Sequence, residues 1–125
     1  LEEIDQHLLH VDGVMLGREA YHNPYILSSF DSRYYGDQNP SKTREEVVMA
    51  MLPYISQQLE KYGDSGKGLK LNSVTRHMLG LTFGLIGARA FRQTLSDTKK
   101  LAIGNPSLLL EALLKVKDAN HGASI

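Results

Sequence analysis

One short stretch of this sequence has the pattern of a β-strand. Residues 11–16 end in the apolar run Val14-Met15-Leu16 and lead through Gly17-Arg18 into a short helical pattern. Successive apolar residues are typical of a strand that is covered on both faces, as in a parallel sheet. A single strand cannot make a sheet, and we predict no strand after residue 16. The sequence therefore predicts a mainly α chain that starts with the last piece of a larger α/β domain.

Helical patterns lie on both sides of this expected strand. Leu1, Ile4 and Leu8 have helical spacing, with acidic residues between them, so residues 1–9 are predicted to form an amphipathic helix. Pro24 suits the first turn of a helix that we expect to run from residue 25 to about residue 35. Helix, strand and helix in this order are typical of an α/β protein.

The rest of the chain predicts a helical bundle. Residues 36–42 are polar and are interpreted as a linker. Thr43 and Glu46 form a capping-box pattern before a long apolar stripe, which contains Pro53 and ends at Gly63. Proline inside a helix removes one hydrogen bond, so a kink is expected there.

Three further helices are predicted in the second half. One starts at Asn72 or Ser73, and the glycines at 80, 84 and 87 are expected to break the stretch that follows. A helix over residues 88–98 would place Arg89, Arg92 and Lys99 on one face. Asn105-Pro106 starts the last helix, so residues 43–118 form the bundle and residues 119–125 are predicted to be a flexible tail.

The net charge is zero, but the charges are unevenly distributed. Residues 66–100 contain seven Lys or Arg and one acidic residue, whereas residues 1–65 are acidic. Such a positive block indicates a surface that faces a polyanion, and a solvated basic face without a partner is the alternative. Zero cysteines exclude disulfides, thiolate metal sites and a cysteine acid within this chain. No apolar run nears the roughly 18 residues of a membrane span, and no signal peptide pattern is present, so we predict a cytoplasmic protein.

Two segments resemble a known family. GVMLGREAYHNP at 13–24 and TRHMLGLTFGLIGARAFRQTLS at 75–96 are similar to the C-terminal third of tRNA-dihydrouridine synthases, nearest to the dihydrouridine synthase A subfamily. The resemblance extends from residue 11 to about residue 116. It implies a flavin-binding (β/α)₈ TIM barrel followed by a helical domain. Residues 1–36 would then end the barrel, with its last strand at 11–16, residues 37–42 would be the linker, and residues 43–118 would be the tRNA-binding helical domain.

The resemblance also implies roles for individual residues. Gly17 and Arg18 correspond to positions that bind the phosphate of FMN, a role that suits a glycine and free N–H groups at a helix start. From the residues alone, a plain turn and a surface ion pair are the alternatives. Arg89 and Arg92 correspond to tRNA contacts of the subfamily, and Arg76 is expected to add to that surface, with a salt bridge to Glu45 or Glu60 as its alternative.

Four ring side chains remain open to more than one interpretation. His77 is either part of the RNA surface or a structural histidine bonded to a backbone carbonyl. Tyr21, His22 and Tyr25 either line the flavin edge or pack in the core or at a domain interface.

The implied activity is that of a longer enzyme. NADPH would reduce FMN, and a D-loop uridine at position 20 or 20a of tRNA would be reduced to 5,6-dihydrouridine, with a proton supplied by a family cysteine that this chain lacks. The fragment is therefore expected to be inactive alone. Gln93 stands where the subfamily has a second arginine, which reduces the positive charge.

Two rival hypotheses remain at this stage. They are a stand-alone helical RNA-binding module and a protein-interaction bundle. The isolated strand is expected to be disordered, to collapse onto the bundle or to pair with a second copy. No metal site is predicted.

Overall fold

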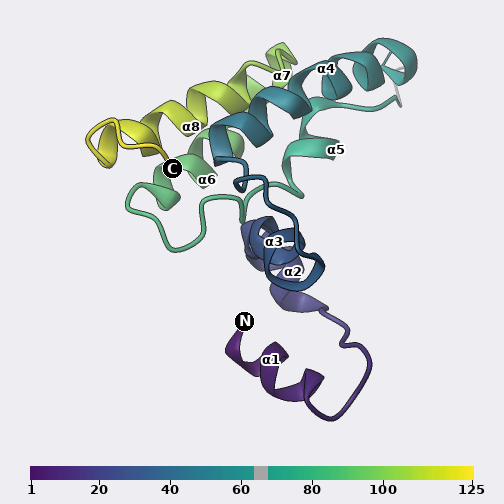
Figure 1. Cartoon of the computed structure of the whole chain (residues 1–125). Helices are drawn as coiled ribbons and strands as arrows, with labels where there is room; N and C mark the ends of the chain where they lie inside the picture. Colours follow the sequence, from purple (N-terminus) through teal and green to yellow (C-terminus); the bar gives the residue numbers. More distant parts are fainter. Residues whose placement is uncertain (64–67) are drawn as a thin grey trace.

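The computed structural model describes residues 1–63 and 68–125, and all the regular secondary structure in these ranges is helical (Figure 1). In chain order its elements are α1 (Glu2–Leu8), α2 (Arg18–His22), the 3₁₀ helix η1 (Pro24–Ser29), α3 (Phe30–Tyr35), α4 (Arg44–Tyr62), α5 (Leu71–Thr75), α6 (Ala88–Leu95), α7 (Thr98–Ile103) and α8 (Leu108–Ala119). The mainly α prediction is confirmed. Lys67 of the positive block, and most of the loop expected after Gly63, lie outside the described residues.

One apolar core holds α4, α6 and α8 together. α6 packs along α8, and α4 lies on another side of α8 (Figure 1). The side chains that are almost completely buried in this core come from four helices: Val48, Ile55, Leu71, Phe91, Leu95, Leu109, Leu113 and Val116. Burial of each large apolar side chain contributes about 1.5–3 kcal/mol. The apolar stripes read from the sequence therefore account for the bundle.

The ends of α4 are set by local signals. Thr43 Oγ1 accepts a hydrogen bond from Glu46 N at 3.2 Å, and Thr43 N donates to Glu46 Oε2 at 2.8 Å. Gly63 N donates to Leu59 O at 2.8 Å where the helix ends. The predicted capping box and helix end are confirmed, and Pro53 lies inside the helix as expected.

Several helix boundaries differ from the prediction. The last helix begins at Leu108 rather than at Pro106, and Asn105 Oδ1 accepts from Ser107 N at 3.0 Å in the turn before it. The stretch predicted as one helix over residues 25–35 forms η1 followed by α3. α5 begins at Leu71, and Ser73 lies inside it, where its Oγ accepts from Lys70 N at 3.3 Å instead of capping a later start. The helix expected over residues 88–98 is divided in two, because Asp97 Oδ1 accepts from Lys99 N at 3.0 Å and starts α7. Lys99 therefore does not share a helix with Arg89 and Arg92. The break at the three glycines is confirmed, since residues 76–87 form turns only.

The strand expected at residues 11–16 is not formed. Residues 11–12 form a bend, residues 13–17 have no regular secondary structure, and Met15 is 87% exposed. A strand needs a neighbouring strand to pair its backbone groups, and residues 1–63 and 68–125 contain none. The prediction of a strand was wrong for this chain, and pairing with a second copy stays a prediction.

The N-terminal helices extend away from the bundle. α2, η1 and α3 lie between α1 and the bundle (Figure 1). Arg44 joins the two parts, because its guanidinium lies 3.8 Å from the Tyr25 ring centroid and its Nε donates to Leu81 O at 2.7 Å. Burial lowers the pKa of Arg44, which stays charged at neutral pH.

The last residues contact the start of α4. Ile125 O accepts from Arg44 N at 2.8 Å, and the Ile125 side chain packs against the core. Asn120 Nδ2 donates to Ile86 O at 2.9 Å. These contacts connect the segment that we predicted to be a flexible tail to two separate parts of the bundle.

Candidate functional site

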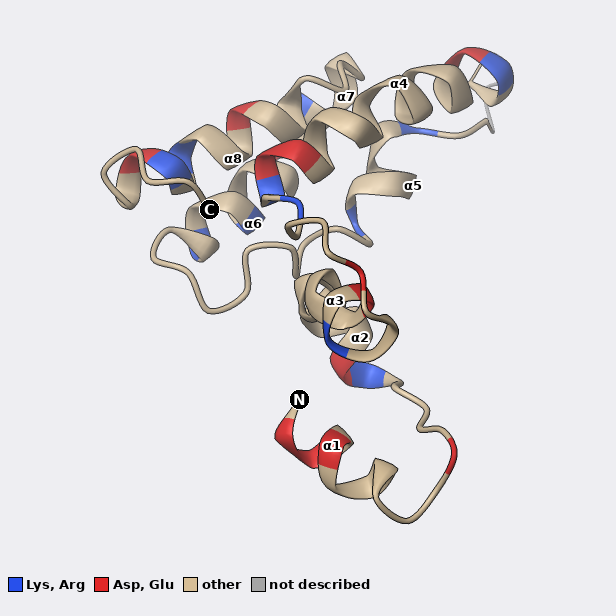
Figure 2. Ribbon diagram, in the orientation of Figure 1, with Lys and Arg blue, Asp and Glu red and all other residues tan. Residues whose placement is uncertain are grey.

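The predicted tRNA-binding arginines are exposed, and none of them pairs with a carboxylate of residues 1–63 or 68–125. Arg89 and Arg92 lie one turn apart on α6, and Arg76 follows the end of α5, where Figure 2 shows blue segments. The ion pairs in the described part of the chain involve His7, Arg33, Lys100 and Lys117 instead. The alternative of a salt bridge from Arg76 to Glu45 or Glu60 is thus not found there. All three guanidiniums are available to an anion.

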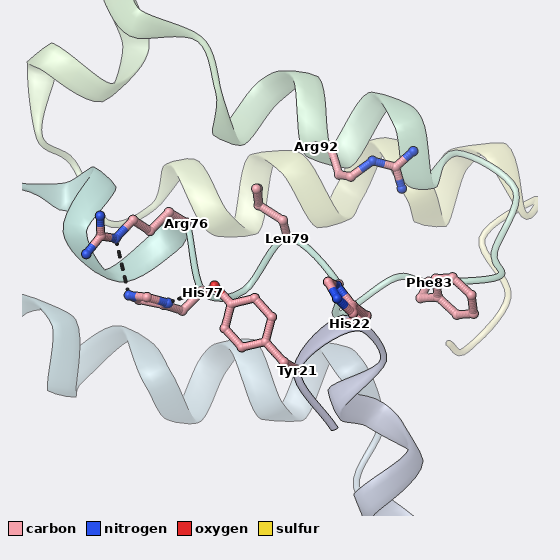
Figure 3. A pocket seen from close by; sticks show the side chains of 8 residues that line it. Tyr21, His22, Arg76, His77, Leu79, Phe83 and Arg92 are labelled. Carbon is pink, nitrogen blue, oxygen red and sulfur yellow. Dashed lines mark hydrogen bonds between the residues drawn. The ribbon is translucent and has the colours of Figure 1, made fainter. Parts of the chain in front are cut away.

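A pocket lies where the N-terminal helices meet the bundle. Its volume is about 440 Å³, and it lies between the end of α2, the turns at 76–83 and α6 (Figure 3). We call it the junction pocket. Its polar and aromatic lining comes from six residues: Tyr21, His22, Arg76, His77, Phe83 and Arg92. The structure thus brings Arg76 and Arg92 to one pocket, whereas Arg89 does not line it.

Two of these side chains are connected to Arg76 by hydrogen bonds. Arg76 Nε donates to His77 Nε2 at 3.2 Å, and His77 Nδ1 lies 3.0 Å from Tyr21 Oη (Figure 3). A guanidinium only donates, so His77 Nε2 must accept; we infer a neutral ring with its proton on Nδ1. Nδ1–H then donates to Tyr21 Oη, and the hydroxyl proton of Tyr21 is left for another acceptor. His77 therefore has side-chain partners rather than the backbone carbonyl of the structural interpretation.

A glycine allows the two sides of the pocket to approach. A Cβ at Gly80 would lie 2.3 Å from His22 O and 3.1 Å from Pro24 Cδ. No side chain fits at this distance, so the end of α2 can lie against the turn only because residue 80 is glycine. The sequence pattern marked Gly80 as a helix breaker but did not indicate this contact.

Gly17 and Arg18 lie at the other end of α2. A Cβ at Gly17 would meet only Met15 Sδ at 3.8 Å, so the surroundings leave room for a side chain at this position. The N-terminus of α2 has no side-chain cap, and Arg18 is exposed. These donors fit one phosphate contact of a flavin nucleotide. The fit is partial, because the neighbouring pocket of about 310 Å³ that includes Gly17 is also lined by the carboxylates of Glu3 and Glu19, which disfavour an anion.

Residues 1–63 and 68–125 contain neither a metal-binding cluster nor a membrane-spanning helix. No cluster of three or more His, Asp or Glu side chains there is arranged to hold a metal ion. None of the helices in these ranges combines the length and the hydropathy needed to span a membrane.

The sequence of this chain is similar to that of a known protein family. The family model described as dihydrouridine synthase matches residues 1–118. The chain belongs to this family. The resemblance read from residues 13–24 and 75–96 is therefore confirmed.

Curated relatives carry a more specific name. The chain is 44% identical over 116 residues to the tRNA-dihydrouridine(20/20a) synthase of Vibrio vulnificus, a match that covers 93% of this chain and 34% of the relative. It is 45% identical over 112 residues to the protein of that name from Synechocystis, covering 90% and 32%, and 50% identical over 97 residues to that from Shewanella oneidensis, covering 78% and 27%. This dihydrouridine synthase chain thus spans about a third of the length of the relatives it matches.

Proposed function

We propose that this chain is the C-terminal, tRNA-gripping part of a tRNA-dihydrouridine synthase that acts on uridines 20 and 20a of the D-loop. The observation that supports this most is the similarity to relatives of that name over more than nine-tenths of the chain. Arg76, Arg89 and Arg92 add physical support, because they are exposed and form no ion pair within the described residues, and Arg76 and Arg92 also line a pocket with aromatic side chains.

The proposed chemistry is divided between this chain and the rest of a cytoplasmic enzyme with a TIM barrel. FMN, when bound, supplies the hydride that reduces the C5=C6 bond of uridine, and NADPH is the reductant that restores it. Within this chain, Gly17 and Arg18 would bind the phosphate of FMN. The chain has no cysteine, so the family's cysteine, which protonates C5, would lie elsewhere in the enzyme, and this part alone would be inactive.

Positive charge would hold the tRNA. Each guanidinium that contacts a phosphate releases a counterion, so binding weakens as salt rises. Arg89 and Arg92 project from one face of α6, where two contacts form without bending the helix. The two arginines would hold the backbone while the target base leaves its stack to reach the flavin.

The test is the double substitution Arg89→Ala with Arg92→Ala in the intact protein that carries this chain. We expect tRNA binding to weaken by about 1–3 kcal/mol for each arginine while FMN stays bound, measured by filter binding and by flavin absorbance. Lys61→Ala, which removes an exposed cation at the far end of α4, is the matched control and should change neither. If the intact protein does not bind tRNA, or if its binding does not depend on salt, the proposal is refuted. If the double variant loses its flavin, Arg89 and Arg92 do not serve tRNA binding alone.

A further inference from the structure

We propose that the junction pocket holds one unstacked nucleotide of the RNA, with its base against Phe83 and its two flanking phosphates at Arg76 and Arg92. This rests on the proposed tRNA binding and adds a defined site to it. The residues involved come from α2, from the turns at 76–83 and from α6, so the nucleotide would be held at the contact between the two parts of the molecule.

The charge of the pocket selects an anion. Arg76 and Arg92 both line it and lie on opposite sides of Figure 3, with Leu79, His22 and Tyr21 between them. No Asp or Glu is among the described residues that line it. Because Arg76 uses Nε for His77, its two terminal amino groups remain free to donate. Two separate cationic positions fit a nucleotide within a chain, which has a phosphate on each side, better than a free mononucleotide with one.

The aromatic side chains supply a surface for a base. Phe83 is 55% exposed and Tyr21 is 53% exposed, although both line a pocket. Exposed rings beside arginines are typical of sites where RNA bases stack. Base pairing in a duplex hides the base faces, so the occupant must be a single-stranded or extruded nucleotide.

Hydrogen bonds among the lining side chains leave one donor group for a ligand. The Arg76–His77–Tyr21 connection leaves the Tyr21 hydroxyl proton without an acceptor in it, so this group can donate to a base carbonyl or a phosphate oxygen. The volume of about 440 Å³ lies in the usual range of small-molecule pockets, about 300–1,000 Å³. The size of the pocket, its positive charge and its hydrogen-bond donors are therefore all consistent with a bound nucleotide.

The experiment compares how variants of the intact protein depend on salt. Stacking releases no counterion, so Phe83→Ala should weaken tRNA binding by about 5- to 100-fold at every salt concentration, with an unchanged slope of log K against log salt. Arg92→Ala should reduce that slope by about one. Ile86→Ala is the matched control, because Ile86 is 72% exposed on the same run of turns and does not line the pocket. This variant should change neither the affinity for tRNA nor the slope.

Other variants separate stacking from folding and from the proposed function. Phe83→Trp should keep the affinity and Phe83→Leu should lose it, with thermal melts showing that all variants are folded. Unchanged affinity in Phe83→Ala, while Arg89→Ala still weakens binding, would overturn the pocket and leave the proposed function standing. If neither variant changes tRNA binding, both fail. If Phe83→Ala abolishes binding of uridine monophosphate but not of tRNA, the pocket takes a free nucleotide and the proposal is overturned.

Discussion

Gly80 forms a close backbone contact with the end of α2. A methyl group at this position would overlap His22 O at 2.3 Å and His22 C at 2.8 Å, and backbone atoms cannot move aside as a flexible side chain can. We expect Gly80→Ala to separate α2 from the turns at 76–83 and to lower the free energy of unfolding by about 1–3 kcal/mol, measured by urea denaturation. Gly13→Ala is the control, since nothing lies within 4 Å of its Cβ. Equal stability of the two variants would show that the contact is not formed in solution.

Only some of the residues that line the junction pocket could be predicted from the sequence. Arg76 and Arg92 were identified from the positive block and from the family pattern, yet the sequence gives no sign that Tyr21 bonds to His77, 56 residues later. Phe83 was missed as a site residue. The available signal was an aromatic residue between glycines in a basic stretch, where a helix cannot bury it.

At the scale of the element, α4 is the helix whose start is fixed most clearly by side chains. Thr43→Ala removes the hydroxyl that caps Glu46 N, so we expect a loss of about 1 kcal/mol in the free energy of unfolding, measured by urea denaturation. Ser56→Ala, in the exposed middle of the same helix, should be neutral or slightly stabilising because alanine has the higher helix propensity. A loss in the Ser56 variant as large as that in the Thr43 variant would contradict the capping argument.

Helices were predictable where one local rule decided them. α4 follows from an apolar stripe with a cap and a stop in the sequence. α8 follows from its apolar stripe alone, because it begins at Leu108 and its N-cap Ser107 makes no side-chain cap hydrogen bond. The division of α6 from α7 was missed because Asp97 competes for the backbone N–H groups of Lys99 and Lys100, a choice that periodicity does not register. The strand at 11–16 was wrong because strand formation depends on a partner, and local pattern cannot supply one.

At the scale of the whole molecule, α1 is attached by polar contacts rather than by a core. It has no buried residue. Asp5 forms an ion pair with Arg33 and accepts from Tyr34 Oη at 2.8 Å, which joins α1 to α3. The hydrogen bond from Arg33, followed by that from Tyr34, lowers the pKa of Asp5 below its ordinary value. The position of α1 should therefore depend on the charge of one exposed carboxylate.

The sign of the pH dependence follows from that lowered pKa. Stabilisation by Asp5 is fully present above the unfolded pKa of about 3.9 and is lost as the pH falls through the lower folded value. We expect the NMR signals of α1 to shift towards those of a free segment below about pH 4, while the signals of α8 stay native to lower pH. Asp5→Asn should release α1 already at pH 7, and Glu2→Gln, at an exposed position of α1, should not. If α1 stays docked in the Asp5 variant, apolar contacts of Ile4 and Leu8 hold it instead, and the attachment would not respond to acid.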